Sequence, residues 1–204
     1  MEIIQRGNRL PIIRTKRLIL RDIRLEDITE EYISWLNNPE INKFLEIRFT
    51  PQTKQKVIEY VEAKLEDTVN TKHFGVYDQD GKRLVGTVTL PHINQHHQFA
   101  DISFVIGHSD AGGKGYATEA VHGVCYYMFK FCGLNKLIGG YYSDHIASAR
   151  VFETNRFEIE GRLRGKCLNY QNQRVDHVVV GILADEFIPD DRYLGQLPAV
   201  KREG

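Results

Sequence analysis

The chain has 204 residues, of which 42% are hydrophobic and 26% are charged. This balance is typical of a globular protein, and the length suits one well-filled α/β domain better than two. Lysine plus arginine and aspartate plus glutamate both number 27, so the formal net charge is zero. Without excess positive charge there is no field that would draw the chain onto nucleic acid or an anionic membrane, and we expect neither partner.

The N-terminal segment and the cysteines indicate the cellular compartment and the state of the thiols. The opening "MEIIQRGNRLPIIRTKR" lacks the continuous apolar core and small-residue cleavage site of a signal peptide. The three cysteines, Cys125, Cys132 and Cys167, are an odd number without the spacing of metal ligands. We therefore expect a cytoplasmic protein that holds no metal and has idle thiols.

Hydrophobic patterns predict the elements of the first half of the chain. Alternation over 15–24 predicts the first strand. Helical spacing predicts one helix over 25–38, which Pro39 ends, and a second over 51–67. A hairpin is expected over 72–90, because "DQDG" favours a turn between two alternating segments.

The second half of the chain continues the alternation of strands and helices. One strand is expected over 98–108, followed by a glycine-rich loop and a helix that Gly133 ends. A strand over 135–142, a short helix over 144–155 and a closing hairpin over 156–184 follow. We expect a single domain over 1–204, with a core of about 13–185 and an extended tail over 186–204.

The glycine-rich loop is the most informative motif. In "DAGGKGYATEA", Asp110–Ala120, it joins a strand to a helix, so unpaired backbone N–H groups lie at the positive end of the helix dipole, where an anion binds. The P-loop pattern fails, because Gly115 follows Lys114 where serine or threonine is required. The dinucleotide pattern fails as well, because Thr118 stands where its third glycine is required.

The strand "ISFVIG", the loop and the helix start "GKGYATEA" together resemble the acetyl-CoA site of the GNAT acetyltransferase superfamily. The order of elements resembles this superfamily from "TKRLILRDI" to "VVVGIL", and more narrowly the ribosomal-protein N-terminal acetyltransferases. The resemblance implies a single α/β domain with a mixed, mostly antiparallel sheet, split into a V and flanked by helices. It also implies acetyl-CoA as a co-substrate.

The resemblance assigns residues to acetyl-CoA. Gly115, Tyr116 and Ala117 match the second half of the family's pyrophosphate-binding motif, whereas Gly112 stands where the family has glutamine or arginine. In the family, the strand before the loop pairs with the pantetheine arm. The implied co-substrate site comprises Phe104, Val105, Ile106, Gly112, Gly113, Lys114, Gly115, Tyr116, Ala117, Thr118 and His145.

Acetyl transfer to an amine requires two proton transfers, and the sequence offers candidates for both. An attacking amine has to lose a proton, and Asp101, in the middle of an otherwise apolar strand, is the candidate base; a structural ion pair is the alternative. The leaving thiolate has to gain a proton, but Phe152 stands where many family members have a tyrosine. Ser148 is the candidate donor, with Tyr141 and Tyr142 as further candidates.

The resemblance implies N-acetyltransferase activity by direct transfer to a primary amine, which we expect on a protein N-terminus or a nucleotide-linked amino sugar. In "WLNNPEINKFLEIRF", Glu40 and Glu46 suit a cationic acceptor, whereas Lys43 and Arg48 suit a diphosphate. Phe152 and Gly112 leave open a non-catalytic acyl-CoA-binding module, and a phosphate-binding module unrelated to CoA is a third reading. The tail after Phe187 is a candidate homodimer contact.

Overall fold

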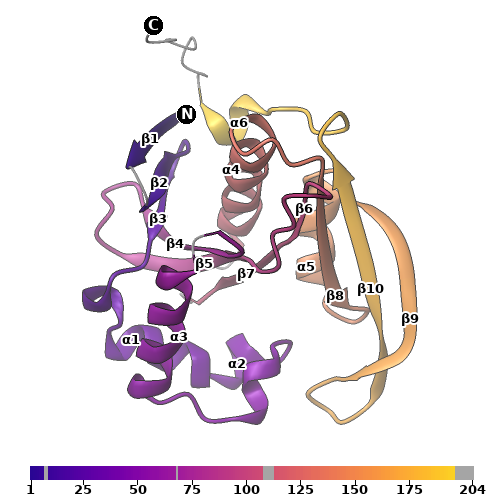
Figure 1. The fold of residues 1–204 in the computed structure, drawn as a ribbon. Helices are drawn as coiled ribbons and strands as arrows, with labels where there is room; N and C mark the ends of the chain where they lie inside the picture. Colours follow the sequence, from indigo (N-terminus) through magenta and orange to yellow (C-terminus); the bar gives the residue numbers. More distant parts are fainter. Residues whose placement is uncertain (7–8, 68, 108–112, 196–204) are drawn as a thin grey trace, which may run out of the picture.

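The computed structural model describes residues 1–6, 9–67, 69–107 and 113–195, and its strands form two sheets (Figure 1). In the first sheet the order is β1-β2-β3-β4-β5-β7, with every pair antiparallel. Its strands are β1 (Glu2–Arg6), β2 (Arg9–Arg14), β3 (Leu18–Asp22), β4 (Lys72–Asp78), β5 (Leu84–Leu90) and β7 (Ser103–Ile106).

The second sheet has the order β6-β8-β10-β9. Its β6 and β8 are parallel, and its other pairs are antiparallel. This confirms the expected mixed, mostly antiparallel sheet split into two arms. The strands are β6 (Phe99–Asp101), β8 (Lys136–Tyr142), β9 (Glu158–Leu168) and β10 (Arg174–Leu183).

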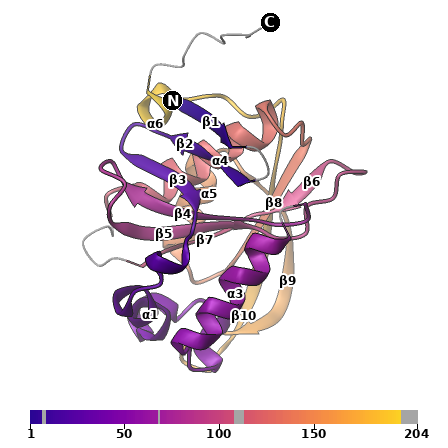
Figure 2. The same ribbon diagram turned by 60° about the vertical axis from the view of Figure 1, so that its left-hand side comes forward.

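Helices cover both faces of the first sheet. In Figure 2, α1 and α3 lie below it and α4 lies above it. Among the described residues no helix has the length and apolar character needed to cross a bilayer. The helices are α1 (Glu30–Asn37), α2 (Pro39–Asn42), α3 (Lys54–Glu66), α4 (Tyr116–Lys130), α5 (Ile146–Thr154) and α6 (Asp191–Leu194), with 3₁₀ turns η1 (Leu25–Asp27) and η2 (Glu46–Phe49).

Two apolar cores hold these layers together. One lies between the first sheet, α4 and the second sheet, and its buried side chains include Phe74, Val88, Met128 and Phe152. The other lies between α1, α3 and the opposite face of the first sheet. Its buried side chains include Trp35 of α1. Cys125 is fully buried in the first core, in agreement with the expectation of an idle thiol.

Two predictions about the N-terminal half were wrong in detail. The strand over 15–24 is the third strand rather than the first, because β1 and β2 form a hairpin before it. The expected helix over 25–38 is divided into η1 and α1, and α1 ends at Asn37, before Pro39 as predicted. Pro39 itself occupies the first turn of α2, where its missing N–H is not needed, and Asn38 caps that helix.

The expected single strand over 98–108 is divided between the two sheets. Its first part, β6, pairs with β8, and its second part, β7, pairs with β5. Between them, Ile102 donates its N–H to the carbonyl of Ile138 on β8 at 2.7 Å. The apolar alternation continues across this break, so the sequence pattern does not reveal it.

The described part of the C-terminal tail packs on the domain and does not extend away from it. Phe187 and Leu194 are buried. Lys16 donates its N–H to the Tyr193 carbonyl at 2.8 Å, and the Asp190 N–H donates to Nε2 of His122 on α4 at 3.0 Å. Apolar residues beyond Leu183 explain this return to the core, and a homodimer contact through the tail stays a prediction.

Candidate active site

The two sheets separate on the C-terminal side of Ile102, and this leaves one edge of β7 open. Pairing between β6 and β8 ends at Asp101 and Ile138, whereas β7 continues to pair with β5 on its other side. The Ile102 N–H points to β8, and the Gly107 N–H donates to Val85 on β5 at 3.1 Å. Because N–H directions alternate along a strand, the N–H groups of Phe104 and Ile106 point into the split, and that of Val105 points to β5.

The loop before α4 ends in backbone suited to an anion. Gly115 caps α4 with φ of 76°, and Gly113 has φ of 73°, a region that favours glycine. A Cβ on Gly113 would have no described atom within 4 Å, so none of the described residues crowds this turn. Gly112 lies outside the described residues. Gly113, Lys114, Gly115, Tyr116, Ala117 and Thr118 thus surround the N-terminus of α4, close in sequence to the end of β7.

A buried ion pair fixes this first turn of α4. Glu119 is fully buried, and its carboxylate accepts hydrogen bonds from the Thr15 hydroxyl at 2.7 Å and the Arg17 N–H at 2.7 Å. The Arg17 Nε donates to its second oxygen at 2.6 Å, and Arg17 Nη1 donates to the Lys114 carbonyl at 2.8 Å. The β2–β3 turn therefore holds both the glycine turn and the helix.

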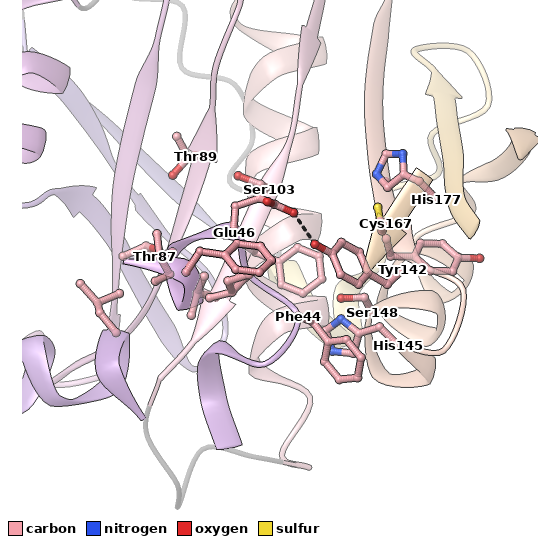
Figure 3. Close-up of a pocket in the computed structure, with 18 of the residues that line it drawn as sticks. Phe44, Glu46, Thr87, Thr89, Ser103, Tyr142, His145, Ser148, Cys167 and His177 are labelled. Atoms are coloured by element: carbon pink, nitrogen blue, oxygen red, sulfur yellow. Dashed lines mark hydrogen bonds between the residues drawn. The ribbon is translucent and has the colours of Figure 1, made fainter. Parts of the chain in front are cut away.

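A cavity of about 820 Å³ lies beside the split (Figure 3). Thr87, Thr89 and Ser103 line it from the first sheet, and Tyr142, Cys167 and His177 line it from the second. Side chains of α1, η2 and α3 complete the wall, and most of these are aromatic or aliphatic. Among the described residues that line the cavity, Glu46 is the one carboxylate.

Glu46 belongs to a group of polar contacts that ties η2 to the second sheet. The Tyr142 hydroxyl donates to the Glu46 carboxylate (Figure 3). Arg48 donates through Nη1 to the Tyr142 oxygen at 3.2 Å and through Nη2 to the Leu168 carbonyl. Burial, together with the adjacent Glu46, raises the pKa of Tyr142 to about 12. Arg48 is thus engaged by two residues that line the cavity, Tyr142 and Leu168.

The other charged residues of this segment lie elsewhere. Glu40 is 83% exposed and pairs with Lys43 at 3.1 Å, and neither lines the cavity. Of the two carboxylates expected near a cationic acceptor, the cavity therefore includes only Glu46.

The start of α5 forms the floor of the cavity near the split. His145 caps this helix, and its ring stacks on Phe44 with 3.9 Å between centroids. Burial lowers the pKa of His145 to about 4, so its ring is neutral at neutral pH. Ser148 and Phe152 are buried and also line the cavity, and the Phe152 ring contacts Phe104 with 5.5 Å between centroids.

Asp101 occupies a different environment from the one that its sequence position suggests. It lies on β6, and its carboxylate is 3.1 Å from Nδ1 of His92. Among the described residues, those that line the cavity do not include Asp101, because the chain passes from one sheet to the other directly after it. The role of base stays a prediction for Asp101, which kinetics of an Asp101 variant would test.

Sequence reasoning missed two adjacent glycines in β8. A Cβ on Gly139 would lie 2.4 Å from Cε1 of Phe152, and one on Gly140 would lie 2.6 Å from Nε2 of His177. Each glycine therefore makes room for a ring that lines the cavity, one on each face of β8. Two glycines inside an apolar strand were the available signal, because such glycines mark close approach.

We expect the free energy of unfolding to depend on pH because of His73, which lines the sheet side of the cavity. Its ring contacts the Thr89 hydroxyl through Nδ1 at 2.8 Å, and burial lowers its pKa to about 4. The unfolded state binds a proton near pH 6.5 and the folded state does not until about pH 4, so stability falls as the pH drops through this range. At pH 5 we expect His73 alone to cost about 2 kcal/mol relative to pH 8.

Urea unfolding of the wild type and of His73→Gln at both pH values measures this term. The variant should lose less stability between pH 8 and pH 5, and the exposed His97→Gln should behave as wild type. An identical pH dependence for His73→Gln and wild type would contradict the assignment.

The split and the α4 turn fit an acyl-CoA thioester. The open edge of β7 provides N–H groups in the way an added strand would use them, and the glycine turn provides donors for a pyrophosphate. A strand edge and an anion-binding helix start on either side of one loop define an acyl-CoA-dependent transferase fold.

Comparison with known proteins gives the family. Residues 17–158 match the acetyltransferase (GNAT) domain model. The probable N-acetyltransferase YjcK of Bacillus subtilis is 30% identical over 186 residues, which cover 88% of this chain and 99% of the relative. The chain belongs to the GNAT family and is an acetyl-CoA-dependent N-acetyltransferase.

One further relative agrees with this family, and one solved structure agrees with the fold. The uncharacterized N-acetyltransferase YoaA of Bacillus subtilis is 28% identical over 156 residues, 76% of this chain and 86% of the relative. The structure of spermidine N-acetyltransferase from Vibrio cholerae, in complex with CoA and spermine, superimposes with a TM-score of 0.72 at 23% identity and covers 83% of this chain and 96% of that one. The latter likeness concerns the fold.

Proposed function

We propose that the protein transfers the acetyl group from acetyl-CoA directly to a primary amine whose acceptor molecule carries a single positive charge. The observation that carries this proposal is the carboxylate of Glu46, because the other described residues that line the cavity have neutral or basic side chains. An ammonium group entering the cavity finds one counter-charge, which suits a peptide N-terminus or an amino sugar.

A polyamine fits this cavity poorly. Lys166 and Arg174 of the β9–β10 hairpin line it, and they would repel the further ammonium groups of spermidine. The same two cations would favour an acceptor that also carries a carboxylate or a phosphate. Resemblance to the ribosomal-protein N-terminal acetyltransferases supports peptides, and this narrower membership is part of the proposal.

Glu46 is the proposed proton acceptor. A neutral amine has to attack the thioester, and a carboxylate in the same cavity draws the ammonium in and removes its proton, directly or through water. The N–H groups of Phe104 and Ile106 in the split would bind the thioester and stabilise the charge that develops on its carbonyl oxygen. Because both substrates occupy one site, transfer needs no acetylated enzyme.

Acetyl-CoA-dependent thiol release against a panel of amines tests this function. The panel contains peptides with free N-termini, nucleotide-linked amino sugars and spermidine. Turnover of a peptide or amino sugar well above spermidine is expected. A marked preference for spermidine would overturn the acceptor class, and acetyl-CoA binding without turnover of any amine would favour the non-catalytic alternative.

We expect Glu46→Gln to lower kcat/KM for the amine about 100-fold and to leave the acetyl-CoA dissociation constant unchanged, because the amide can accept a hydrogen bond but no proton. Steady-state kinetics and calorimetry measure the two quantities. Glu62→Gln, at an exposed position of α3, is the matched control. If Asp101→Asn lowers kcat and Glu46→Gln does not, Asp101 is the base and the present assignment is wrong.

A further inference from the structure

One hydroxyl at the split is left without a role in the proposed function. Tyr141 lines the cavity and is half-buried, and its neighbour Tyr142 is already engaged by Glu46 and Arg48. Alternation along β8 separates the two tyrosines: Tyr142 shares a face with Gly140 and His177, and Tyr141 shares a face with Gly139 and Phe152.

A row of three rings connects Tyr141 to the open edge of β7. Its ring is stacked with Phe152 at 6.1 Å between centroids and an interplanar angle of 21°. The Phe152 ring in turn contacts Phe104 at 5.5 Å. Phe104 is the residue whose N–H points into the split. The tyrosine therefore lies across the split from the edge proposed to bind the thioester.

We infer that Tyr141 donates the proton that the leaving CoA thiolate requires, an inference that rests on the proposed function. The amine nitrogen forms a bond to the thioester carbonyl carbon, and the carbon–sulfur bond then breaks with its electron pair on sulfur. Sulfur takes the hydroxyl proton of Tyr141, and the tyrosinate regains a proton from water. The ammonium first gives one proton to Glu46, which releases it to solvent, and the nitrogen loses a second proton to water as the amide forms. This second proton offsets the one that Tyr141 regains from water, so the reaction is balanced without another reactant.

The other side chains at this end of the cavity suit the step less well. His145 is unprotonated at neutral pH, because burial lowers its pKa to about 4. Burial and the nearby Lys166 likewise lower the pKa of His177, which lies on the opposite face of β8. Phe152 has no proton to give. Ser148, at the start of α5, has a hydroxyl that also lines the cavity, and it serves as the competing assignment in the test.

The test compares Tyr141→Phe with Ser148→Ala and with the double variant Tyr141→Phe, Phe152→Tyr. We expect Tyr141→Phe to lower kcat at least tenfold with little change in the acetyl-CoA dissociation constant. The double variant returns a hydroxyl to the stacked ring and should recover part of the loss. Tyr193→Phe, on α6, is the control for removal of a tyrosine hydroxyl.

A second readout does not depend on turnover. A hydroxyl that donates to the thiolate stabilises it, so the thiolate fraction of CoA bound to the protein, followed by its ultraviolet absorbance against pH, should be lower in Tyr141→Phe. Ordinary kcat in Tyr141→Phe, with a large loss in Ser148→Ala, would assign the proton to Ser148 and overturn the inference. If kcat falls in Tyr141→Phe and does not recover in the double variant, and the thiolate fraction is unchanged, Tyr141 has only a packing role and the inference is overturned.

These outcomes are separable from failure of the proposed function. The wild type is assayed first with the amine panel, and its acceptor class does not depend on Tyr141. The pH titration of bound CoA tests the proposed hydrogen bond between Tyr141 and the thiolate, and it needs no amine acceptor.

Discussion

Glu119→Ala is expected to lower the free energy of unfolding by about 3 kcal/mol, because it removes a buried carboxylate that three donors surround and leaves Arg17 without its partner. Arg17 is 39% exposed at its side chain, so it regains water and the loss stays at the lower end for a broken buried pair. For a chain of this length the midpoint of thermal unfolding should fall by roughly 6–12 °C.

The same substitution should weaken acetyl-CoA binding, because Arg17 also holds the Lys114 carbonyl in the glycine turn. Calorimetric unfolding and acetyl-CoA titration measure the two effects. Glu153→Ala, at an exposed position of α5, is the control and should change neither. Unaltered stability in Glu119→Ala would mean that the buried pair only offsets its own desolvation.

Gly139→Ala is expected to cost about 2 kcal/mol of stability and at least tenfold in kcat. The new Cβ would fall 2.4 Å from Cε1 and 2.5 Å from Cζ of Phe152, so the ring has to move. Phe104 and Tyr141 both contact that ring, and its displacement alters the split where the thioester is expected to bind.

Gly161→Ala provides a matched control for this change. Gly161 also lies in a strand, β9, and a Cβ there would have no described atom within 4 Å. Urea unfolding and steady-state kinetics of the two variants should therefore differ clearly. Equal effects of the two substitutions would show that both positions need glycine for its backbone conformation. The contact with Phe152 would then not explain the effect of Gly139→Ala.

Local patterns were sufficient for most of the elements, and they allowed a prediction of the co-substrate site. Helical spacing and the glycine turn predicted α4, and alternation predicted β4, β5 and the closing hairpin. The residues 113–118 were identified because a glycine loop before a helix works through backbone N–H groups, which depend on local conformation. The residue type at each position of the turn is enough to indicate such a site.

Which side chains line the cavity proposed for the acceptor depends on the tertiary structure. Asp101 and Val105 are four residues apart in what reads as one strand, but the break at Ile102 assigns them to different sheets. Glu46 and Tyr142 are 96 residues apart and meet in the cavity. The alternation of apolar and polar residues indicates which face of a strand is buried, but it does not indicate with which strand it pairs.

The sequence by itself therefore determined the fold class, because periodicity and turn chemistry act within short segments, and its motifs carried the family resemblance, which implies a backbone site for acetyl-CoA. Only the tertiary structure brought Glu46, Tyr141 and Phe152 to one cavity. The reason is physical: proton transfer depends on distances between side chains of different elements, and these are set by how sheets and helices pack.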